Sequence, residues 1–319
     1  MYSLHFYGQM LADAPRMNAY AAALRRTVNR DSVVMDLGCG PGVFALLACK
    51  LGARRVYAVE PDNVIGLARE AAAANGFADR IEFFETLSTE IELPEPATII
   101  VSDLRGVLPW FEQNLSSIID ARKRLLAPRG GVLIPRRDIL WAAVVEAPEQ
   151  YAELVSPWQN QFDLDLCAAT RFITNNWRKT QIEPEQFLAE PVCWNTIDYY
   201  EVESRDVRAE ITWRAARNGT AQGFAVWFDS ELVDDTGFSN HPAGPRMIYG
   251  QGFFPFSQPV EIVEGDRIEL RLAANFVQDN YVWRWDTDFI DQERVKASFK
   301  QSTFYGVPLS TAQLRTSAR

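Results

Sequence analysis

The chain has 319 residues, 47% of them hydrophobic and 23% charged, which is typical of a folded globular protein. Its net charge of −10 argues against a nucleic-acid partner, because phosphate binding needs a basic face. It has no apolar run long enough to cross a membrane, and its four scattered cysteines and two histidines indicate neither a metal site nor a disulfide framework. Because the N-terminus also lacks a signal-peptide pattern, we expect a cytoplasmic protein.

The first 135 residues alternate between strand and helix patterns. Apolar or alternating runs typical of strands lie at residues 33–36, 55–60, 81–84, 97–102 and 132–134. Helical spacing occurs at residues 9–28, 43–52, 68–75 and 111–126. Because strands that alternate with helices form parallel sheets, residues 1–135 predict a doubly wound, Rossmann-like α/β domain.

The pattern changes from residue 136 onward. Long alternating segments lie at residues 139–146, 207–215, 223–231, 267–273 and 281–286, separated by turn signals. They predict an antiparallel β-barrel or sandwich over residues 136–319. A segment at about 157–182 is rich in aromatic residues and lacks strand alternation, so we expect an inserted helical arm. Its large apolar side chains would need a partner surface, which predicts a dimer.

A glycine loop follows the first predicted strand. Asp36, Gly38, Gly40 and Gly42 lie in this loop, and Glu60 ends the next strand. This G-x-G-x-G spacing differs from the G-x-G-x-x-G dinucleotide motif. It resembles the loop with which class I methyltransferases bind S-adenosylmethionine (AdoMet). The residues therefore predict an AdoMet site, with Glu60 accepting hydrogen bonds from the ribose hydroxyls.

A second feature is a pair of carboxylates after the strand at 97–102. Asp103 lies at the strand end, where ligands of open α/β sheets bind, and Glu112 starts the next predicted helix. The two side chains could form a pocket for a cation. The residues alone leave an equally good alternative, in which Glu112 is a favourable charge at a helix start and Asp103 an ordinary loop carboxylate.

The segment Ser102–Glu112 resembles the double-E loop of the protein arginine methyltransferases, with Gly106 in register. Residues 10–20 are similar to the M-L-x-D-x-x-R-x-x-x-Y helix of that family, and the arm at 157–182 lies where the family has its dimerisation arm. The resemblance implies a class I methyltransferase sheet followed by a β-barrel with this arm. It also implies a homodimer that uses AdoMet, yields S-adenosylhomocysteine (AdoHcy) and methylates a guanidinium nitrogen of an arginine in a protein or peptide.

The resemblance assigns roles to individual residues. It implies that Asp103 and Glu112 are catalytic and grip the guanidinium, for which the acidic composition would also suit a cationic acceptor. It implies that Arg16 binds the AdoMet carboxylate and that Ser88 and Thr89 contact the adenine. No metal is expected in this chemistry.

Several positions depart from the family pattern, as in a divergent, bacterial-type member. Asp103 is shorter than the usual Glu, and the Thr-His-Trp loop falls on Met247-Ile248-Tyr249, so its histidine is absent. Tyr7 stands where the family often has His. We expect four residues in the acceptor pocket: Tyr7, Asp13, Arg105 and Tyr249.

Arg105 occupies a loop position that is usually Met. It could neutralise Glu112, bind a carboxylate of the acceptor, or point to solvent. These departures leave two alternatives open beside arginine methylation. One is a methyltransferase on the same scaffold that acts on a small molecule or another peptide side chain. The other is a catalytically weak scaffold or partner subunit.

Overall fold

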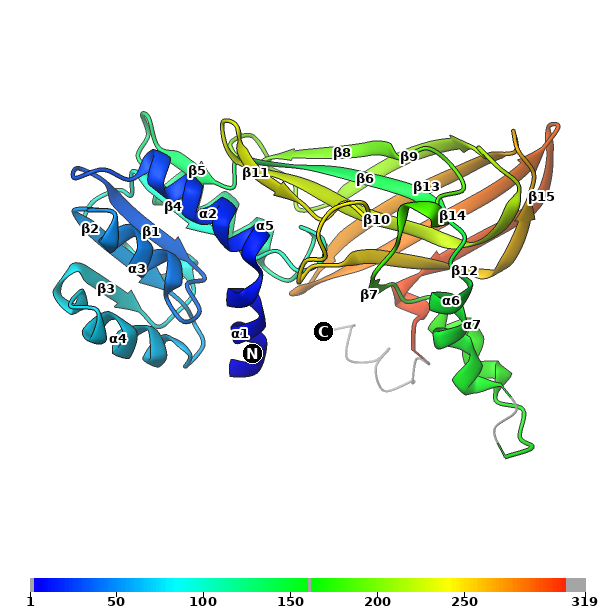
Figure 1. Ribbon diagram of the computed structural model, residues 1–319, viewed down its shortest axis with the longest axis horizontal. Coiled ribbons are helices and arrows are strands. Elements are labelled where there is room, and N and C mark those ends of the chain that lie inside the picture. The colour runs from blue at the N-terminus through cyan, green and yellow to red at the C-terminus, as the bar shows by residue number, and fades with distance from the viewer. Residues whose placement is uncertain (1–2, 160–161, 308–319) are drawn as a thin grey trace.

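Two sheet systems of different architecture follow one another in the computed structural model, which describes residues 3–159 and 162–307 (Figure 1). The first is a parallel sheet in the order β3-β2-β1-β4-β5. Its strands are β1 Val33–Leu37, β2 Arg55–Val59, β3 Ile81–Phe84, β4 Ile99–Ser102 and β5 Val132–Ile134. Every residue of β1 and β4 is buried, because both faces of a parallel sheet are covered. The predicted α/β sheet is thereby confirmed.

Five helices accompany this sheet: α1 Leu4–Ala12, α2 Ala14–Thr27, α3 Val43–Lys50, α4 Ile65–Ala74 and α5 Asn114–Arg124. The single helix predicted at 9–28 is wrong, because the chain breaks at Asp13. The Asp13 carboxylate accepts a hydrogen bond from the Arg16 backbone N–H at 3.4 Å and so caps α2, and Pro15 fits the first turn. No residue of α1 is buried, and it extends from α2 beside the sheet (Figure 1).

The second system consists of antiparallel strands. One sheet has the order β7-β12-β10-β6-β8, with β11 paired to β10, and the other has the order β15-β14-β13-β9. The bounds of the first sheet are β6 Arg137–Val145, β7 Arg178–Thr180, β8 Val192–Asp198, β10 Gly219–Val233, β11 Thr236–Ser239 and β12 Gln251–Ile262. Those of the second are β9 Val207–Arg214, β13 Arg267–Val277, β14 Asn280–Asp291 and β15 Arg294–Ser302. Contacts of β8 with β9 and of β12 with β15 join the sheets into a barrel-like unit.

The arm projects from this unit (Figure 1). It comprises α6 Pro148–Val155, α7 Thr170–Ile173 and the connecting segments. It therefore starts earlier than the predicted 157, and the end of the predicted segment is strand β7, which pairs with β12. Short 3-10 turns occur within the arm at Ser156–Trp158 and Cys167–Ala169, and elsewhere at Ala78–Arg80, Ser88–Glu90, Pro184–Gln186 and Thr303–Tyr305. Within the described ranges, no helix is both long and apolar enough to cross a bilayer.

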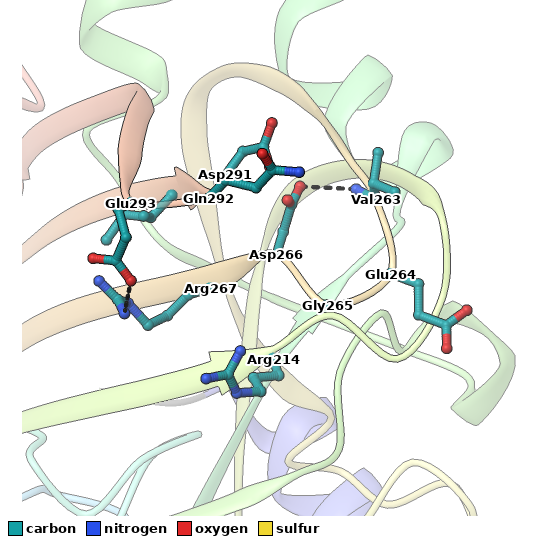
Figure 2. A pocket seen from close by; sticks show the side chains of 10 residues that line it. Arg214, Val263, Glu264, Gly265, Asp266, Arg267, Asp291, Gln292 and Glu293 are labelled. Carbon is teal, nitrogen blue, oxygen red and sulfur yellow. Dashed lines mark hydrogen bonds and ion pairs between the residues drawn. The ribbon is translucent and has the colours of Figure 1, made fainter.

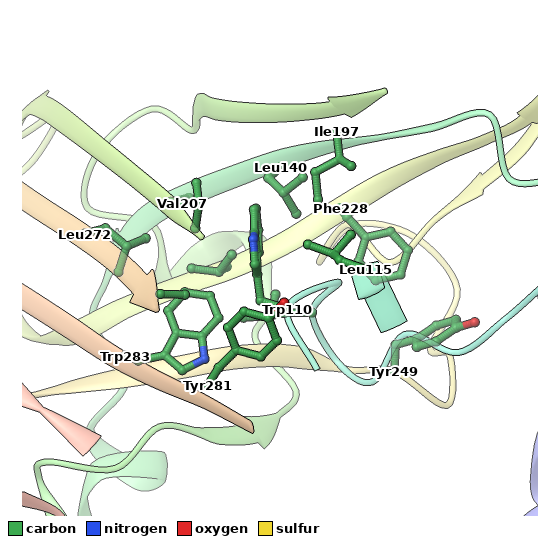
Figure 3. Close-up of a cluster of buried hydrophobic side chains, with 14 of the residues drawn as sticks. Trp110, Leu115, Leu140, Ile197, Val207, Phe228, Tyr249, Leu272, Tyr281 and Trp283 are labelled. Atoms are coloured by element: carbon green, nitrogen blue, oxygen red, sulfur yellow. The ribbon is translucent and has the colours of Figure 1, made fainter. Parts of the chain in front are cut away.

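The loop between β4 and α5 is anchored in the barrel core. Trp110 of this loop is 3% exposed and meets Trp283 of β14 edge-on, with ring centroids 6.0 Å apart (Figure 3). It also stacks on Trp194 of β8 at 5.2 Å. Aromatic contacts of this kind add to the free energy of burial. The barrel thus holds the loop that carries Asp103 at the edge of the parallel sheet.

Candidate active site

The glycine loop crosses the carboxyl ends of β1 and β2. Gly38 and Gly40 have φ values of 72° and 51°, a conformation that favours glycine. A Cβ on Gly38 would lie 2.0 Å from Leu104, and one on Gly40 would lie 2.9 Å from the ring of Tyr7. The backbone N–H of Gly38 donates to the Val59 carbonyl at 2.9 Å. The loop is therefore fixed on β2, with its backbone close to α1.

Glu60 follows β2 and turns its carboxylate toward this loop. It accepts hydrogen bonds from the backbone N–H groups of Gly40 and Asp62, both at 3.0 Å. Burial raises its pKa, and the two backbone hydrogen bonds oppose this rise. A carboxylate offers about four acceptor positions, so Glu60 keeps capacity for further donors such as ribose hydroxyls. This geometry fits the predicted cofactor role.

A small cavity of about 50 Å³ lies between α1 and the glycine loop. Its walls include Tyr7, Met10, Arg16, Gly38, Gly40, Phe44 and Asp103. Tyr7 thus lies on the glycine-loop side, whereas the sequence predicted it in the acceptor pocket. Neither Asp36 nor Ser88 nor Thr89 belongs to this lining.

Asp36 lies beneath the loop and is fully buried. One carboxylate oxygen accepts the Ala45 backbone N–H at 2.8 Å, in the first turn of α3, and the other oxygen has no partner among the described residues. Burial raises its pKa to about 7. Asp36 therefore braces the start of α3. Ser88 and Thr89 follow β3 at the same sheet edge, where the Ser88 carbonyl accepts a hydrogen bond from Arg124 at 2.9 Å.

Asp103 follows β4 and is held by three side chains. Arg16 donates from Nε at 2.5 Å, Tyr249 donates its hydroxyl to the carboxylate at 2.7 Å, and Arg105 Nε lies 3.4 Å away. Burial alone would lower the pKa of Arg16, but Asp103, Tyr249 and Tyr20 together outweigh it and the pKa is raised. Arg16 also donates from Nη1 to the Met10 carbonyl, and its Nη2 has no hydrogen bond within the described chain.

A larger cavity of about 390 Å³ adjoins the first, because Met10, Arg16 and Asp103 line both. Its other walls come from α1, the 105–111 loop and the barrel, and they are largely aromatic: Phe6, Trp110, Phe111, Trp177, Tyr281 and Trp283, together with Lys179, Ile248 and Tyr249. Among the described residues of this lining, Asp103 is the only acid. The carboxylate thus stands in the wall between the two cavities.

Glu112 does not join Asp103 in this structure. It is exposed, has a φ of 40°, and makes no hydrogen bond or ion pair within the described part of the chain. The predicted convergence of the two carboxylates is therefore absent. The reason is the burial of Trp110 in the barrel, which anchors the loop two residues earlier and leaves Glu112 at the surface before α5.

Arg105 lines the larger cavity but is buried, which excludes the alternative in which it points to solvent, and it is not paired with Glu112. Its Nη1 donates to Asp138 of β6 and to Ser230 of β10, both at 2.7 Å, and its Nη2 donates to the Tyr20 hydroxyl at 3.1 Å. These partners occupy the guanidinium ends that an acceptor carboxylate would need. Sequence spacing gave no signal for Asp138, which lies 33 residues further along the chain.

Of the other residues predicted in the acceptor pocket, one lines the larger cavity and one does not. Tyr249 lines the larger cavity, as expected from the sequence. Asp13 lines neither cavity, because its second oxygen accepts the Ile248 backbone N–H at 2.8 Å and ties α2 to the barrel. Trp177 belongs to the segment predicted as the arm, but it stacks on Phe254 at 5.6 Å and lines the larger cavity.

A separate hollow of about 500 Å³ lies at the β12–β13 and β14–β15 turns (Figure 2). Three of its charged groups form ion pairs: Arg267 with Glu293 at 3.5 Å, and Asp266 with Lys296 outside the lining, while Asp266 also accepts the Val263 backbone N–H. It shares no lining residue with the two cavities. No cluster of three or more metal-ligating side chains occurs in residues 3–159 and 162–307.

Comparison with known proteins agrees with this geometry. The family described as arginine methyltransferase oligomerization subdomain matches residues 136–290, and that described as ribosomal protein L11 methyltransferase matches residues 20–132. The chain is similar to the protein arginine methyltransferase family. The second family thus matches the sheet that carries the glycine loop, and the first matches the barrel that supplies the aromatic cavity.

Relatives with this family name are similar along most of the chain. Protein arginine N-methyltransferase 2 of Xenopus tropicalis is 28% identical over 302 residues, which is 88% of this chain and 68% of the relative. A probable protein arginine N-methyltransferase 6 of Arabidopsis thaliana is 28% identical over 70% of this chain, which spans only 53% of that relative.

Two solved structures share the fold. The Trypanosoma brucei PRMT1 enzyme-prozyme complex with AdoHcy has a TM-score of 0.84 and 23% identity, over 95% of this chain and 98% of that one. The Arabidopsis thaliana protein arginine methyltransferase 10 has a TM-score of 0.81 and 22% identity, over 94% and 97%. These values confirm the predicted combination of a Rossmann-like sheet and a barrel.

Proposed function

We propose that this chain transfers a methyl group from AdoMet to a guanidinium nitrogen of an arginine in a protein or peptide. One observation carries the proposal: Asp103, the only acid among the described residues of the larger cavity, stands where that cavity meets the cavity at the glycine loop. A donor bound at the loop and a cationic acceptor bound against the aromatic walls would meet at this carboxylate.

The residues at the glycine loop fit AdoMet. Glu60 has free acceptor positions for ribose hydroxyls, and the bare backbone at Gly38 and Gly40 allows close approach. Arg16 can bind the carboxylate of the cofactor through Nη2 while Nε keeps its contact with Asp103. When bound, AdoMet supplies an electrophilic methyl group on a sulfonium. We assign adenine contacts to the region of Ser88 and Thr89 at the same sheet edge.

The acceptor side works by positioning and charge. A guanidinium in the larger cavity would lie against aromatic rings that attract cations and would donate a hydrogen bond to Asp103. One guanidinium nitrogen would form the new N–CH3 bond as the S–CH3 bond of the sulfonium breaks, which would leave AdoHcy, and the displaced N–H proton would pass through Asp103 to water. In-line transfer of this kind depends chiefly on holding the two reactants in register. Glu112 would contribute only if the 106–113 segment turned inward on binding.

Incubation with AdoMet and an arginine peptide, followed by mass spectrometry, tests the proposal. We expect a gain of one methyl group on arginine in the wild type, and a loss of about 10²-fold in kcat for Asp103→Asn. Glu112→Gln would lose as much only if Glu112 enters the site. If no arginine peptide gained a methyl group, the proposal would be contradicted. A wild-type protein that binds AdoMet but methylates no acceptor would be identified as a scaffold subunit.

The second candidate is methylation of a small acceptor that carries a carboxylate. Lys179 lines the larger cavity, in which Asp103 is the single acid among the described residues, and it donates to the Ile248 carbonyl at the cavity wall. Burial lowers the pKa of Lys179, but its charge would still favour an anionic group. Amino acids with free carboxylates, assayed beside the peptides, distinguish this candidate by which acceptor gains the methyl group.

We propose that the arm pairs with a second copy of the chain. Phe162, Leu164 and Trp158 are 92%, 58% and 41% exposed, and such an apolar surface requires a partner. The family match to an oligomerization subdomain supports this. We expect Phe162→Asp to give a monomer by light scattering with an unchanged thermal midpoint, and a wild-type monomer would contradict the proposal.

The four free cysteines fit a reducing, cytoplasmic location, which we also propose.

A further inference from the structure

Arg105 connects three parts of the molecule beside the site. It belongs to the loop after β4, and its guanidinium reaches Asp138 of β6, Ser230 of β10 and Tyr20 of α2. The plane of the guanidinium lies near Phe228 and Phe238, at 5.2 and 5.7 Å from the ring centroids. Arg105 is therefore held on all sides and cannot swing toward solvent without breaking this set of contacts.

Asp138, which anchors Arg105, is itself fixed. Asp138 is fully buried, and its second oxygen accepts the Tyr199 hydroxyl at 2.6 Å. A buried ion pair adds little to stability compared with apolar residues of the same volume, because two charges must leave water. Apolar side chains at both positions 105 and 138 would fill this interior without that penalty. The pair therefore calls for an explanation other than stability.

The Nε of the same guanidinium supplies this explanation. It lies 3.4 Å from an oxygen of Asp103, which Arg16 and Tyr249 approach from α2 and from the barrel. Arg105 thus faces Asp138 with one end and Asp103 with its Nε. The two acids and two arginines balance in charge, so the carboxylate in the cavity wall is held without a net charge being buried.

We propose that Arg105 is a positioning residue for the methyl transfer, which uses its anchor on Asp138 to hold Asp103 in the wall between the two cavities. This rests on the proposed function. Without Arg105 the Asp103 carboxylate keeps Arg16 and Tyr249 but loses the contact that ties its loop to β6 and β10. Misplacement of a reacting partner by about 1 Å can reduce the rate by about 10²-fold.

Three variants test this: Arg105→Met, Arg105→Lys, and Arg105→Met with Asp138→Leu, which removes both buried charges. Kinetics with AdoMet and the arginine peptide give kcat and KM, and calorimetry gives the affinity for AdoHcy. We expect the folded double variant to bind AdoHcy like the wild type, to keep its peptide KM within about threefold, and to lose about 10²-fold in kcat. We expect Arg105→Lys to lose about tenfold, because an ammonium cannot reach all four partners.

The matched control is Arg122→Met. Arg122 of α5 also bridges to the barrel, donating to the Tyr199 carbonyl at 3.0 Å and to Glu203 at 2.6 Å, but it contacts neither cavity. We expect its kcat to stay within about twofold of wild type. If Arg122→Met lost as much kcat as the double variant, bridging of the two sheet systems rather than positioning of Asp103 would explain the loss, and the proposal would fall.

The outcomes separate clearly. A double variant with wild-type kcat would overturn the proposal, and if that variant does not fold, an undiminished kcat of Arg105→Lys would overturn it. A wild type without turnover would instead refute the proposed function. In that case a crystal structure of Arg105→Lys with AdoHcy decides the positioning role, since the loop that carries Asp103 should have moved away from β6 and β10. An Asp103 in its original place would reject the role.

Discussion

Replacement of Tyr249 by phenylalanine isolates one hydrogen bond at the proposed reaction centre. The ring of Tyr249 stacks on Phe238 at 5.7 Å and meets Phe228 edge-on at 5.2 Å, contacts that phenylalanine keeps. The change removes a hydroxyl that donates to Asp103 at 2.7 Å and accepts from Arg16 at 3.3 Å. The effect on the rate therefore reports the hydroxyl and not the packing.

The magnitude follows from the charge of the acceptor oxygen. A hydrogen bond to a charged group contributes about 1.5–3 kcal/mol, and about 1.4 kcal/mol corresponds to tenfold in rate. If the bond matters most in the transition state, kcat should fall by about 10- to 100-fold. Burial raises the pKa of Tyr249 well above its ordinary value, so the hydroxyl stays protonated and the deficit should not depend on assay pH.

Steady-state methylation of an arginine peptide measures this, with calorimetry for AdoHcy affinity. The matched control is Tyr151→Phe on α6, which removes a single hydrogen bond from a tyrosine hydroxyl to the Ser257 carbonyl at 3.2 Å. We expect the control to retain wild-type kcat. A Tyr249→Phe enzyme with kcat within about threefold of wild type would refute the reasoning that Asp103 needs this donor.

Three further changes test the cofactor side. The folded protein raises the pKa of Asp36 from 3.8 to about 7, so ionisation of Asp36 destabilises the native state as pH rises through this window. Relative to Asp36→Asn, the wild type should lose roughly 4 kcal/mol of unfolding free energy in chemical denaturation as pH rises from 4 through 7. Parallel pH curves for the two proteins would contradict this. Glu60→Gln should weaken AdoMet binding by about tenfold in calorimetry, since a neutral amide accepts ribose hydroxyls less well, and unchanged affinity would rule that contact out. Gly38→Ala should lower the thermal midpoint by several degrees, because its Cβ would meet Leu104 at 2.0 Å and φ is 72°; an unchanged midpoint would mean that Leu104 gives way freely.

Residues placed by strand ends were accessible to sequence reasoning. Glu60 and Asp103 follow β2 and β4, and parallel neighbours bring their carboxyl ends to one edge of the sheet, so a loop and two strands sufficed to place them. This rule does not apply to Arg16, whose role was predicted only through the family resemblance. Its contact with Asp103 spans 87 residues, and no local pattern encodes it.

The aromatic cavity and the Arg105 anchor could not be predicted in this way. Trp283 and Tyr281 alternate on β14 in a pattern that indicates a strand, but not which cavity the strand borders. The prediction that Glu112 lies beside Asp103 was wrong for a related reason. Burial of Trp110 among barrel residues fixes where the loop turns, and this depends on packing between segments far apart in the chain.

Three of the nine tryptophans, Trp110, Trp177 and Trp283, border the larger cavity, and Trp283 lies within 6.3 Å of both of the others. Their indole emission responds to changes in local polarity and to charges placed nearby. An arginine side chain entering between them would displace water from the rings and bring a cation to their faces. Acceptor binding therefore has an intrinsic optical signal, which allows titration of unlabelled peptides independently of turnover.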